Sequence, residues 1–323
     1  MRVLVTGGAG YIGSAAVEML LDEGHEAVVA DNLERGHRNA VDQRARLEVG
    51  DLRDRDFITD LMRKLKPDAV MHFAAYALVA ESMVHPEKYF GNNLTGGINL
   101  AEAMLECGVR KIIFSSTCAT YGLPDEIPIS EEQRQAPVNP YGESKLMLER
   151  MFDWYRRIHG FEPVILRYFN AAGATEKFGE DHDPETHLIP NVLRVAAGRA
   201  DYVPVYGHDY DTPDGTCIRD FIHIVDLVRA HLLALRPGLA GAFNLGTGTG
   251  FSVMEVIQTA RRVTGVDIPV RIEPRRPGDP PRLVARADRA RAELDWKPVR
   301  SDLETIIGDA WQWLQKHPEG YPE

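Results

Sequence analysis

The chain has 323 residues, of which 44% are hydrophobic, and a formal net charge of −11 at neutral pH. This composition supports a large buried core, and the length suits one large or two medium domains. The negative charge disfavours a nucleic-acid or anionic-membrane partner.

The N-terminal apolar run meets glycines after five residues, so it does not resemble a signal peptide. No run approaches the roughly 18 apolar residues of a membrane span. The cysteines (Cys107, Cys118 and Cys217) are odd in number and widely spaced, which favours neither a disulfide framework nor a metal cluster. We therefore expect a protein of the reducing cytoplasm.

The first elements in chain order surround a glycine-rich turn. Residues 3–5 are apolar and β-branched or leucine, as in a buried parallel strand, and a helical pattern follows to Glu23. A second apolar run, 27–30, ends in Asp31. The turn between the first strand and the helix carries Gly7, Gly8, Gly10 and Gly13.

This order of elements predicts a dinucleotide site. Glycines without Cβ atoms allow a tight turn and let a diphosphate approach backbone N–H groups at a helix N-terminus. Asp31 is placed to accept the ribose hydroxyls and to repel a 2′-phosphate, so NAD is favoured over NADP. The alternative, a glycine turn without a ligand, leaves Asp31 unexplained.

Later apolar runs alternate with helical patterns. The sequence predicts strands at 46–49, 69–73, 111–115 and 163–167, and helices at 54–64, 89–106 and 141–159. Such alternation is typical of a doubly wound parallel sheet of the Rossmann type, in which ligands bind beyond the carboxyl ends of the strands. The loops that follow these strands begin at Gly7, Asp31, Asp51, Ala74, Ser116 and Tyr168.

Beyond Ala171 the regular alternation stops, and proline, glycine and histidine become common. We expect a smaller C-terminal α/β substrate domain in which helices and loops predominate. Residues 243–245 are predicted to return to the main sheet, and 302–315 to form a terminal helix. The domains are therefore 1–170, with returning segments near 221–246, and 171–323.

Tyr141 and Lys145 are four residues apart in a predicted helix, so both lie on one face. A neighbouring ammonium favours phenolate over phenol, which would make the tyrosine a base at neutral pH. Thr117, at the end of the preceding strand, could share a substrate oxygen with it or merely cap a turn. Asn92, a poor helix former, could hydrogen-bond near the lysine or mark a bend.

A further acidic loop, DYDTPDG at 209–215, superficially suggests calcium. Its spacing does not match the EF-hand pattern, so we expect no metal there or elsewhere.

Motifs along the whole chain resemble one family. They are TGGAGYIG, DN, GD, HFAA, NN, FSST with ATYG, PYGESK, LRYFNAAGA, GHDYDTPDGT, RDFIHIVDL and RRPGD, in that order. Together they are similar to the UDP-glucose 4-epimerases of the extended short-chain dehydrogenase/reductase superfamily. The resemblance extends to the terminal HPEGYPE, and its second-half motifs narrow it to epimerases.

The resemblance implies a role for each matching residue. The catalytic positions are Tyr141, Lys145 and Thr117. The NAD-contacting positions are Gly7, Gly10, Tyr11, Ile12, Gly13, Asp31, Asn32, Asp51, Leu52, Phe73, Ala74, Asn92, Tyr141, Lys145 and Phe169. The UDP-sugar positions are Thr117, Asn170, His187, Leu188, Tyr206, Arg219, Arg276 and Asp279.

The resemblance also implies a reaction and an assembly. A base removes the proton of the sugar's 4-hydroxyl, and hydride passes to bound NAD. The 4-keto sugar then rotates about its diphosphate linkage and presents its other face before hydride returns. UDP-galactose and UDP-glucose are thereby interconverted. A homodimer is expected from the resemblance alone.

Three positions depart from the family's pattern. Thr117 stands where many relatives have serine, and Ala77 where some have a lysine. Leu283 stands where residue size governs admission of N-acetylated sugars, so acceptance of UDP-N-acetylglucosamine stays open.

Several rival functions share the glycine turn and the Tyr-x-x-x-Lys motif. Nucleotide-sugar dehydratases and decarboxylases usually carry a carboxylate directly after the threonine, whereas this chain has Cys118 and Ala119. An epimerase of UDP-glucuronate or UDP-xylose remains an alternative. A non-catalytic NAD sensor is disfavoured, because the catalytic groups are all present.

Overall fold

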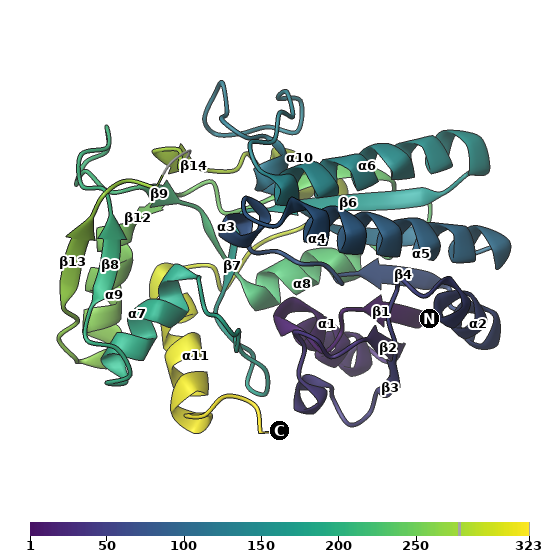
Figure 1. Ribbon diagram of the computed structural model, residues 1–323, viewed down its shortest axis with the longest axis horizontal. Coiled ribbons are helices and arrows are strands. Elements are labelled where there is room, and N and C mark those ends of the chain that lie inside the picture. Colours follow the sequence, from purple (N-terminus) through teal and green to yellow (C-terminus); the bar gives the residue numbers. More distant parts are fainter. Residues whose placement is uncertain (277–278, 323) are drawn as a thin grey trace.

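The computed structural model describes residues 1–276 and 279–322. Figure 1 shows a large sheet flanked by helices and, beside it, a smaller group of helices and short strands that ends in the C-terminal helix. Within the described part of the chain, no helix is both long and apolar enough to cross a membrane.

The large sheet has seven parallel strands in the order β11-β6-β5-β4-β1-β2-β3. The predicted α/β fold is therefore confirmed, including the return of the last strand. Successive strands are added towards one edge of the sheet from β1 to β3 and towards the other edge from β4 onwards. Ligands bind at such a switch point in doubly wound folds. The strands are β1 (Arg2–Thr6), β2 (Glu26–Asp31), β3 (Arg46–Val49), β4 (Ala69–His72), β5 (Lys111–Thr117), β6 (Glu162–Tyr168) and β11 (Gly241–Leu245).

Helices cover both faces of this sheet. Side chains alternate along a strand, so Val3 and Val5 pack with one helical layer while Leu4 packs with the other. The first layer contains α1 (Tyr11–Asp22), α8 (Ile224–Leu233) and α10 (Asp288–Leu294). The second contains α2 (Arg55–Leu65), α5 (Thr95–Glu106) and α6 (Pro140–His159).

The predicted helix over 89–106 is interrupted. After the short α3 (Val79–Ser82), the chain forms α4 (Pro86–Tyr89), a π-helical turn η2 (Phe90–Leu94) and then α5. Asn92 lies in this π turn, so it marks an irregularity in the helix. The turn directs the buried Asn93 towards α6, and π turns of this kind are frequent at functional sites.

The smaller part has three short sheets. β10 (Phe221–His223) pairs with β7 (Asn170–Ala172), and β13 (Val270–Glu273) pairs with β8 (Val203–Tyr206). β9 (Ile218–Arg219) lies between β12 (Phe251–Ser252) and β14 (Arg282–Leu283). The expectation that helices and loops predominate missed these strands, because two to four residues are too few to show a period.

In the described residues, the helices that pack against these sheets around a separate core are α7 (Leu188–Ala196), α9 (Val253–Thr264) and α11 (Leu303–Lys316). Helix α11, whose side chains include Trp311 and Trp313, confirms the predicted terminal helix. Two 3₁₀ turns, η1 (Arg38–Ala40) and η3 (Cys118–Thr120), complete the elements.

Candidate functional site

The glycine turn after β1 is packed too closely for a side chain at Gly7 or Gly13. A Cβ on Gly7, which has a φ of 74°, would lie 2.5 Å from the backbone nitrogen of Ala74. A Cβ on Gly13 would lie 2.1 Å from the carbonyl oxygen of Gly7. Gly10 is the N-cap of α1 and offers no capping side chain, so the first N–H groups of the helix are available to an anion.

Asp31, at the end of β2, lies beside this turn. Its Oδ2 accepts a hydrogen bond from the N–H of Ala9 at 3.0 Å, and its Oδ1 accepts one from Leu33 at 2.9 Å. Burial raises the pKa of Asp31, and these two hydrogen bonds oppose that rise. The Asp31 carboxylate is therefore fixed beside the glycine turn, where the sequence predicts that it binds the ribose hydroxyls of NAD.

Other residues assigned to the cofactor gather at the neighbouring strand ends. The Asn32 side chain donates to Asp51 at 3.2 Å, and Arg53 lowers the pKa of Asp51 to about 2. Phe73 and Ala74 follow β4, where Ala74 contacts the glycine turn. These neighbours form a cradle of backbone N–H groups and one carboxylate, which fits a dinucleotide.

Four further residues assigned to the cofactor occupy different surroundings. The hydroxyl of Tyr11 donates to the carbonyl of Gly173 at 2.7 Å, which joins the glycine turn to the segment after β7. Leu52 and Ile12 are partly buried and pack against the two sheet cores. Phe169 is buried beside Cys118 between β6 and β7.

The start of α6 positions Tyr141. The Asn139 side chain accepts a hydrogen bond from the N–H of Gly142 at 2.8 Å, and Pro140 occupies the first helical turn. Burial raises the pKa of Tyr141, and the Thr117 side chain, at the end of the strand beside this helix, opposes the rise. One turn later, Lys145 Nζ donates to the carbonyl of Ser115 at 2.8 Å.

Burial disfavours the charged forms of both side chains in this pair. It raises the pKa of Tyr141 well above its ordinary value, and Tyr168 adds to the rise. Burial also lowers the pKa of Lys145 to about 7. The prediction that Lys145 and the positive charge of bound NAD together favour the phenolate form of Tyr141 stays a prediction.

Sequence reasoning missed a buried ion pair next to the catalytic lysine. Arg167 Nη2 lies 2.6 Å from Glu149 Oε2, with both side chains less than one-tenth exposed. The hydroxyl of Ser116 also donates to Glu149. Glu149 is one turn beyond Lys145, so the Lys-x-x-x-Glu spacing was a usable signal, although such pairs usually lie on a helix surface.

A second missed group connects the π turn with α6. The Asn93 side chain donates to Ser144 Oγ at 3.0 Å and to the carbonyl of Tyr76 at 3.1 Å. Asn92 donates to Asn93 at 3.1 Å rather than to the lysine. Nearby, the Ser115 and Tyr168 hydroxyls are 2.8 Å apart. The Asn93 contact with Ser144 therefore fixes the helix that carries Tyr141 against the π turn.

The residues assigned to the UDP-sugar form two pairs. Arg219, in β9, makes an ion pair with Asp279. The guanidinium of Arg276 lies 3.8 Å from the ring centroid of Tyr206, at the end of β8. Asn170, at the start of β7, donates to the carbonyl of Asp220 at 3.0 Å. Pro277 and Gly278 of the RRPGD motif lie outside the described residues.

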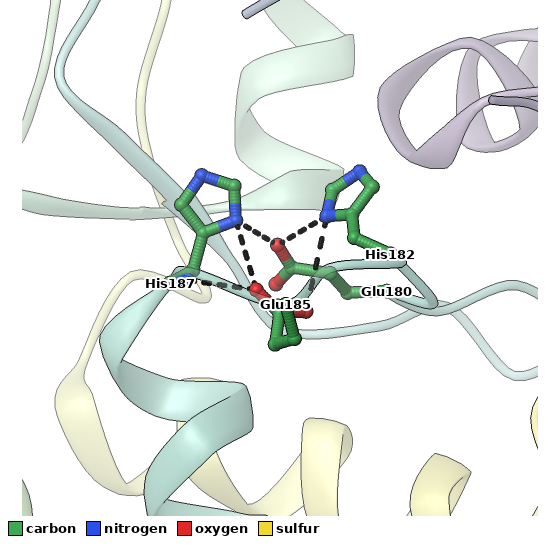
Figure 2. Close-up of side chains that lie close together, drawn as sticks. All are labelled: Glu180, His182, Glu185 and His187. Carbon is green, nitrogen blue, oxygen red and sulfur yellow. Dashed lines mark hydrogen bonds and ion pairs between the residues drawn. The ribbon is translucent and has the colours of Figure 1, made fainter. Parts of the chain in front are cut away.

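His187 and Leu188 lie at the N-terminus of α7. Figure 2 shows that His187 Nδ1 points towards Glu180 and Glu185, at 2.5 and 3.4 Å. Leu188 packs against the core of the smaller part. The assigned UDP-sugar residues therefore come from several elements, with the Nδ1 atom of His187 already engaged by carboxylates.

Leu283, in β14, is partly buried and packs on the cluster that contains Cys118 and Phe169. It therefore connects the substrate-side strands with the 3₁₀ turn that follows Thr117.

The acidic loop that superficially suggested calcium is occupied by protein contacts. Asp214 accepts hydrogen bonds from the N–H and hydroxyl of Thr216, and Asp209 pairs with Arg275 at 2.6 Å.

Comparisons with known proteins agree with this geometry. Residues 3–246 match the model of the NAD dependent epimerase/dehydratase family. The chain is 52% identical to a UDP-glucose 4-epimerase of Streptococcus mutans, with 100% of this chain and 99% of that protein covered.

Two solved structures are also similar. The UDP-glucose 4-epimerase from Bifidobacterium longum, in complex with NAD+ and UDP, is 38% identical with a TM-score of 0.94 and coverage of 99% and 100%. The UDP-Glc/GlcNAc 4-epimerase from Campylobacter jejuni is 43% identical with a TM-score of 0.86 and coverage of 98% and 99%.

Proposed function

The chain belongs to the NAD dependent epimerase/dehydratase family, and we propose that it interconverts UDP-galactose and UDP-glucose by epimerisation at carbon 4 of the sugar. The observation that carries this proposal is the hydrogen bond of Lys145, one turn after Tyr141 in α6, to Ser115 in the strand that ends at Thr117, with the glycine cradle on the same sheet edge.

We propose that residues 1–170, with the segments near 221–246, hold NAD. The glycine turn and the N-terminus of α1 receive the diphosphate, and Asp31 receives the ribose hydroxyls. Bound NAD supplies the reversible hydride acceptor and the positive charge that the chemistry requires. The Lys145 and Tyr141 side chains lie at the carboxyl edge of the same sheet, which is the ligand edge of this fold.

Tyr141 Oη is the group that moves the proton. In the ligand-free chain burial keeps it a neutral phenol, so it becomes a base only when cationic groups offset that burial. Lys145, held by Ser115, provides one such charge, and the bound cofactor provides another. Thr117 Oγ1 orients the sugar hydroxyl whose proton is transferred.

We propose that residues 171–323 hold the UDP-sugar. Arg219 and Arg276 are fork-shaped donors suited to the diphosphate. The contacts of Arg219 with Asp279 and of Arg276 with Tyr206 hold both guanidinium groups in place. Firm anchoring of the nucleotide leaves the sugar free to present either face to the same base.

One observation favours an epimerase over a dehydratase of the same family. The two residues directly after Thr117 are Cys118 and Ala119, and neither is a carboxylate. Removal of water needs an additional acid and base beside the sugar. Incubation of the protein with UDP-galactose tests this: UDP-glucose without net NADH supports epimerisation, and a 4-keto-6-deoxy product contradicts it.

Tyr141→Phe tests the base. The ring remains, so we expect unchanged UDP binding and a loss of turnover of about 10²–10⁴-fold, the contribution of a positioned acid–base group. Isothermal titration with UDP and a coupled assay for UDP-glucose measure the two quantities. Near-normal epimerisation by this variant refutes the role of Tyr141.

The choice of sugar depends on the surroundings of Leu283. Its partly buried contact with the Cys118 and Phe169 cluster limits the space beside the catalytic turn, so we propose a preference for unacetylated sugars. UDP-glucuronate and UDP-xylose are the remaining alternative substrates. Initial rates on UDP-galactose and UDP-N-acetylgalactosamine distinguish the possibilities, and equal rates contradict the preference.

We also propose that two chains pair through the outer surfaces of α5 and α6, which lie side by side in Figure 1. Ile98, Met147, Trp154 and Ile158 are all at least 40% exposed on these helices, and an apolar surface of this kind is typical of an interface. Sedimentation of the Trp154→Glu variant tests it, with a monomer expected. An unchanged mass for this variant contradicts the interface.

The state of the cysteines is relevant to the cellular compartment of the protein. All three are free thiols, in agreement with a proposed location in the reducing cytoplasm.

A further inference from the structure

Two histidines and two glutamates converge in the segment between β7 and α7, outside the proposed catalytic group. Each contributes one nitrogen or oxygen to a set of atoms that lie within 4.8 Å of one another. Figure 2 shows the four side chains directed towards a common centre; they are Glu180, His182, Glu185 and His187.

The distances around this centre suit a small metal ion. Glu180 Oε1 lies 3.2 Å from His182 Nδ1 and 2.5 Å from His187 Nδ1. Glu185 completes the ring, with Oε2 3.8 Å from His182 Nδ1 and Oε1 3.4 Å from His187 Nδ1. For zinc–nitrogen bonds of about 2.0–2.1 Å, the corners of a tetrahedron lie about 3.3 Å apart. The distances from the glutamate oxygens to the two Nδ1 atoms, between 2.5 and 3.8 Å, lie on either side of this spacing.

Two atoms at the centre lack well-directed hydrogen bonds. Glu180 Oε1 and His182 Nδ1 are inaccessible to solvent, and their contact at 3.2 Å does not have hydrogen-bond geometry. The Glu180 and Glu185 side chains are only 6% and 4% exposed. Burying poorly satisfied polar atoms is costly, and an ion bound to both atoms would remove that cost.

The charges of the four side chains also favour a bound divalent cation. Two carboxylates and two neutral imidazoles carry a charge of −2, which a divalent cation neutralises. Imidazole and carboxylate are the donors that zinc accepts, and four protein ligands with tetrahedral spacing are typical of a structural zinc site. Two protonated histidines would balance the charge equally well, but would leave the buried Glu180 Oε1 and His182 Nδ1 without well-directed hydrogen bonds.

Contacts with other parts of the chain hold the segment that carries these residues at several points. Residues 173–187 form neither helix nor strand. Asp181 connects the segment to the C-terminus through a hydrogen bond from the N–H of Tyr321 at 2.8 Å, and its carbonyl contacts His37 at 2.9 Å. The ring of Tyr11, from the glycine turn, meets the edge of His182. An ion bound here would stabilise a loop that contacts both parts of the molecule.

We propose that this cluster is a structural zinc site. The ion binds Nδ1 of both histidines and one oxygen of each glutamate, and fixes the loop that leads into α7. This proposal departs from the expectation of no metal, which was drawn from the cysteine spacing and the acidic loop at 209–215. Binding of this kind contributes directly to folding stability.

The test measures zinc in the full-length protein, produced without a histidine tag and passed through gel filtration. His182→Gln removes one ligand. His85→Gln is the matched control, because His85 is an exposed histidine whose Nδ1 lies 3.4 Å from Glu87 without further ligands. We expect about one zinc per chain in the unaltered protein and the control, and less than about 0.1 in His182→Gln.

Cobalt exchange supplies an independent readout, since a tetrahedral cobalt site has strong visible absorption. We expect this absorption in the control and its loss in His182→Gln. Should His182→Gln fail to fold by circular dichroism, Glu180→Gln replaces it, because it keeps the side-chain volume and removes the charge. Zinc below about 0.1 per chain in the unaltered protein after incubation with excess zinc, or equal zinc in both variants, overturns the proposal. Neither readout depends on epimerase activity.

Discussion

Lys145 is expected to lower the stability of the fold while it serves the reaction. Burial lowers its pKa from 10.5 to about 7, which corresponds to about 5 kcal/mol at roughly 1.4 kcal/mol per pKa unit. Lys145→Met removes this cost but also removes the hydrogen bond to Ser115, worth about 1–3 kcal/mol when the carbonyl is left unpaired. We therefore expect the NAD-free variant to be more stable by about 2–4 kcal/mol near pH 6.

The sign of the pH dependence follows from the lowered pKa. Below about pH 7 the lysine is charged in both the folded and the unfolded chain, and the full cost applies. As the pH rises from about 7 towards 10.5, only the unfolded chain stays charged, and the cost disappears. The advantage of Lys145→Met should therefore be large near pH 6 and absent or reversed near pH 10, where the lost hydrogen bond to Ser115 is the main remaining difference.

Lys111 provides a matched control. It is a buried lysine at the start of the same strand β5, with a pKa lowered to about 8 by burial, and it donates to the carbonyls of Arg236 and Leu239. Lys111→Met should retain epimerase turnover, whereas Lys145→Met should lose about 10²–10⁴-fold. Urea unfolding at the two pH values measures the stabilities. A Lys145→Met variant that is no more stable than the unaltered protein near pH 6 refutes the argument.

Three other substitutions test the remaining parts of the site. Gly13→Ala places a Cβ 2.1 Å from the Gly7 carbonyl, so we expect the NAD content of the purified protein, assayed after acid release, to fall at least about tenfold. An unchanged NAD content contradicts the close packing. Glu149→Gln leaves the Arg167 guanidinium buried without its carboxylate, with an expected loss of about 3–5 kcal/mol in urea unfolding. The double variant Glu149→Leu/Arg167→Met should recover most of this loss, and a double variant as unstable as the single one excludes the ion-pair explanation. Asp31→Asn keeps an acceptor for the Ala9 N–H but removes the negative charge that repels a 2′-phosphate, so the ratio of NADP to NAD affinity should rise. Fluorescence titrations measure this ratio, and an unchanged value counts against the assignment of Asp31 to the ribose.

The structure also limits what the Tyr-x-x-x-Lys motif establishes. The spacing correctly placed Tyr141 and Lys145 on one face of α6, but it could not give their charge states. Those depend on burial beneath β5 and on Tyr168, which lies in another strand. Proximity of two residues in sequence therefore predicts contact better than it predicts pKa.

The sequence by itself determined the parallel sheet, the glycine turn, Asp31 and the helix that carries Tyr141. Each depends on local periodicity or on a short spacing, because the conformation of a strand, a turn or a helix is set by residues a few positions apart.

The tertiary structure decided the features that join distant segments. The Arg167 and Glu149 pair links β6 with α6, and Arg219 meets Asp279 across 60 residues. The donor atoms of the 180–187 cluster are close in sequence, yet their common centre depends on how the loop folds against its neighbours. No periodicity records such contacts, since burial and charge compensation arise only when the chain has closed around them.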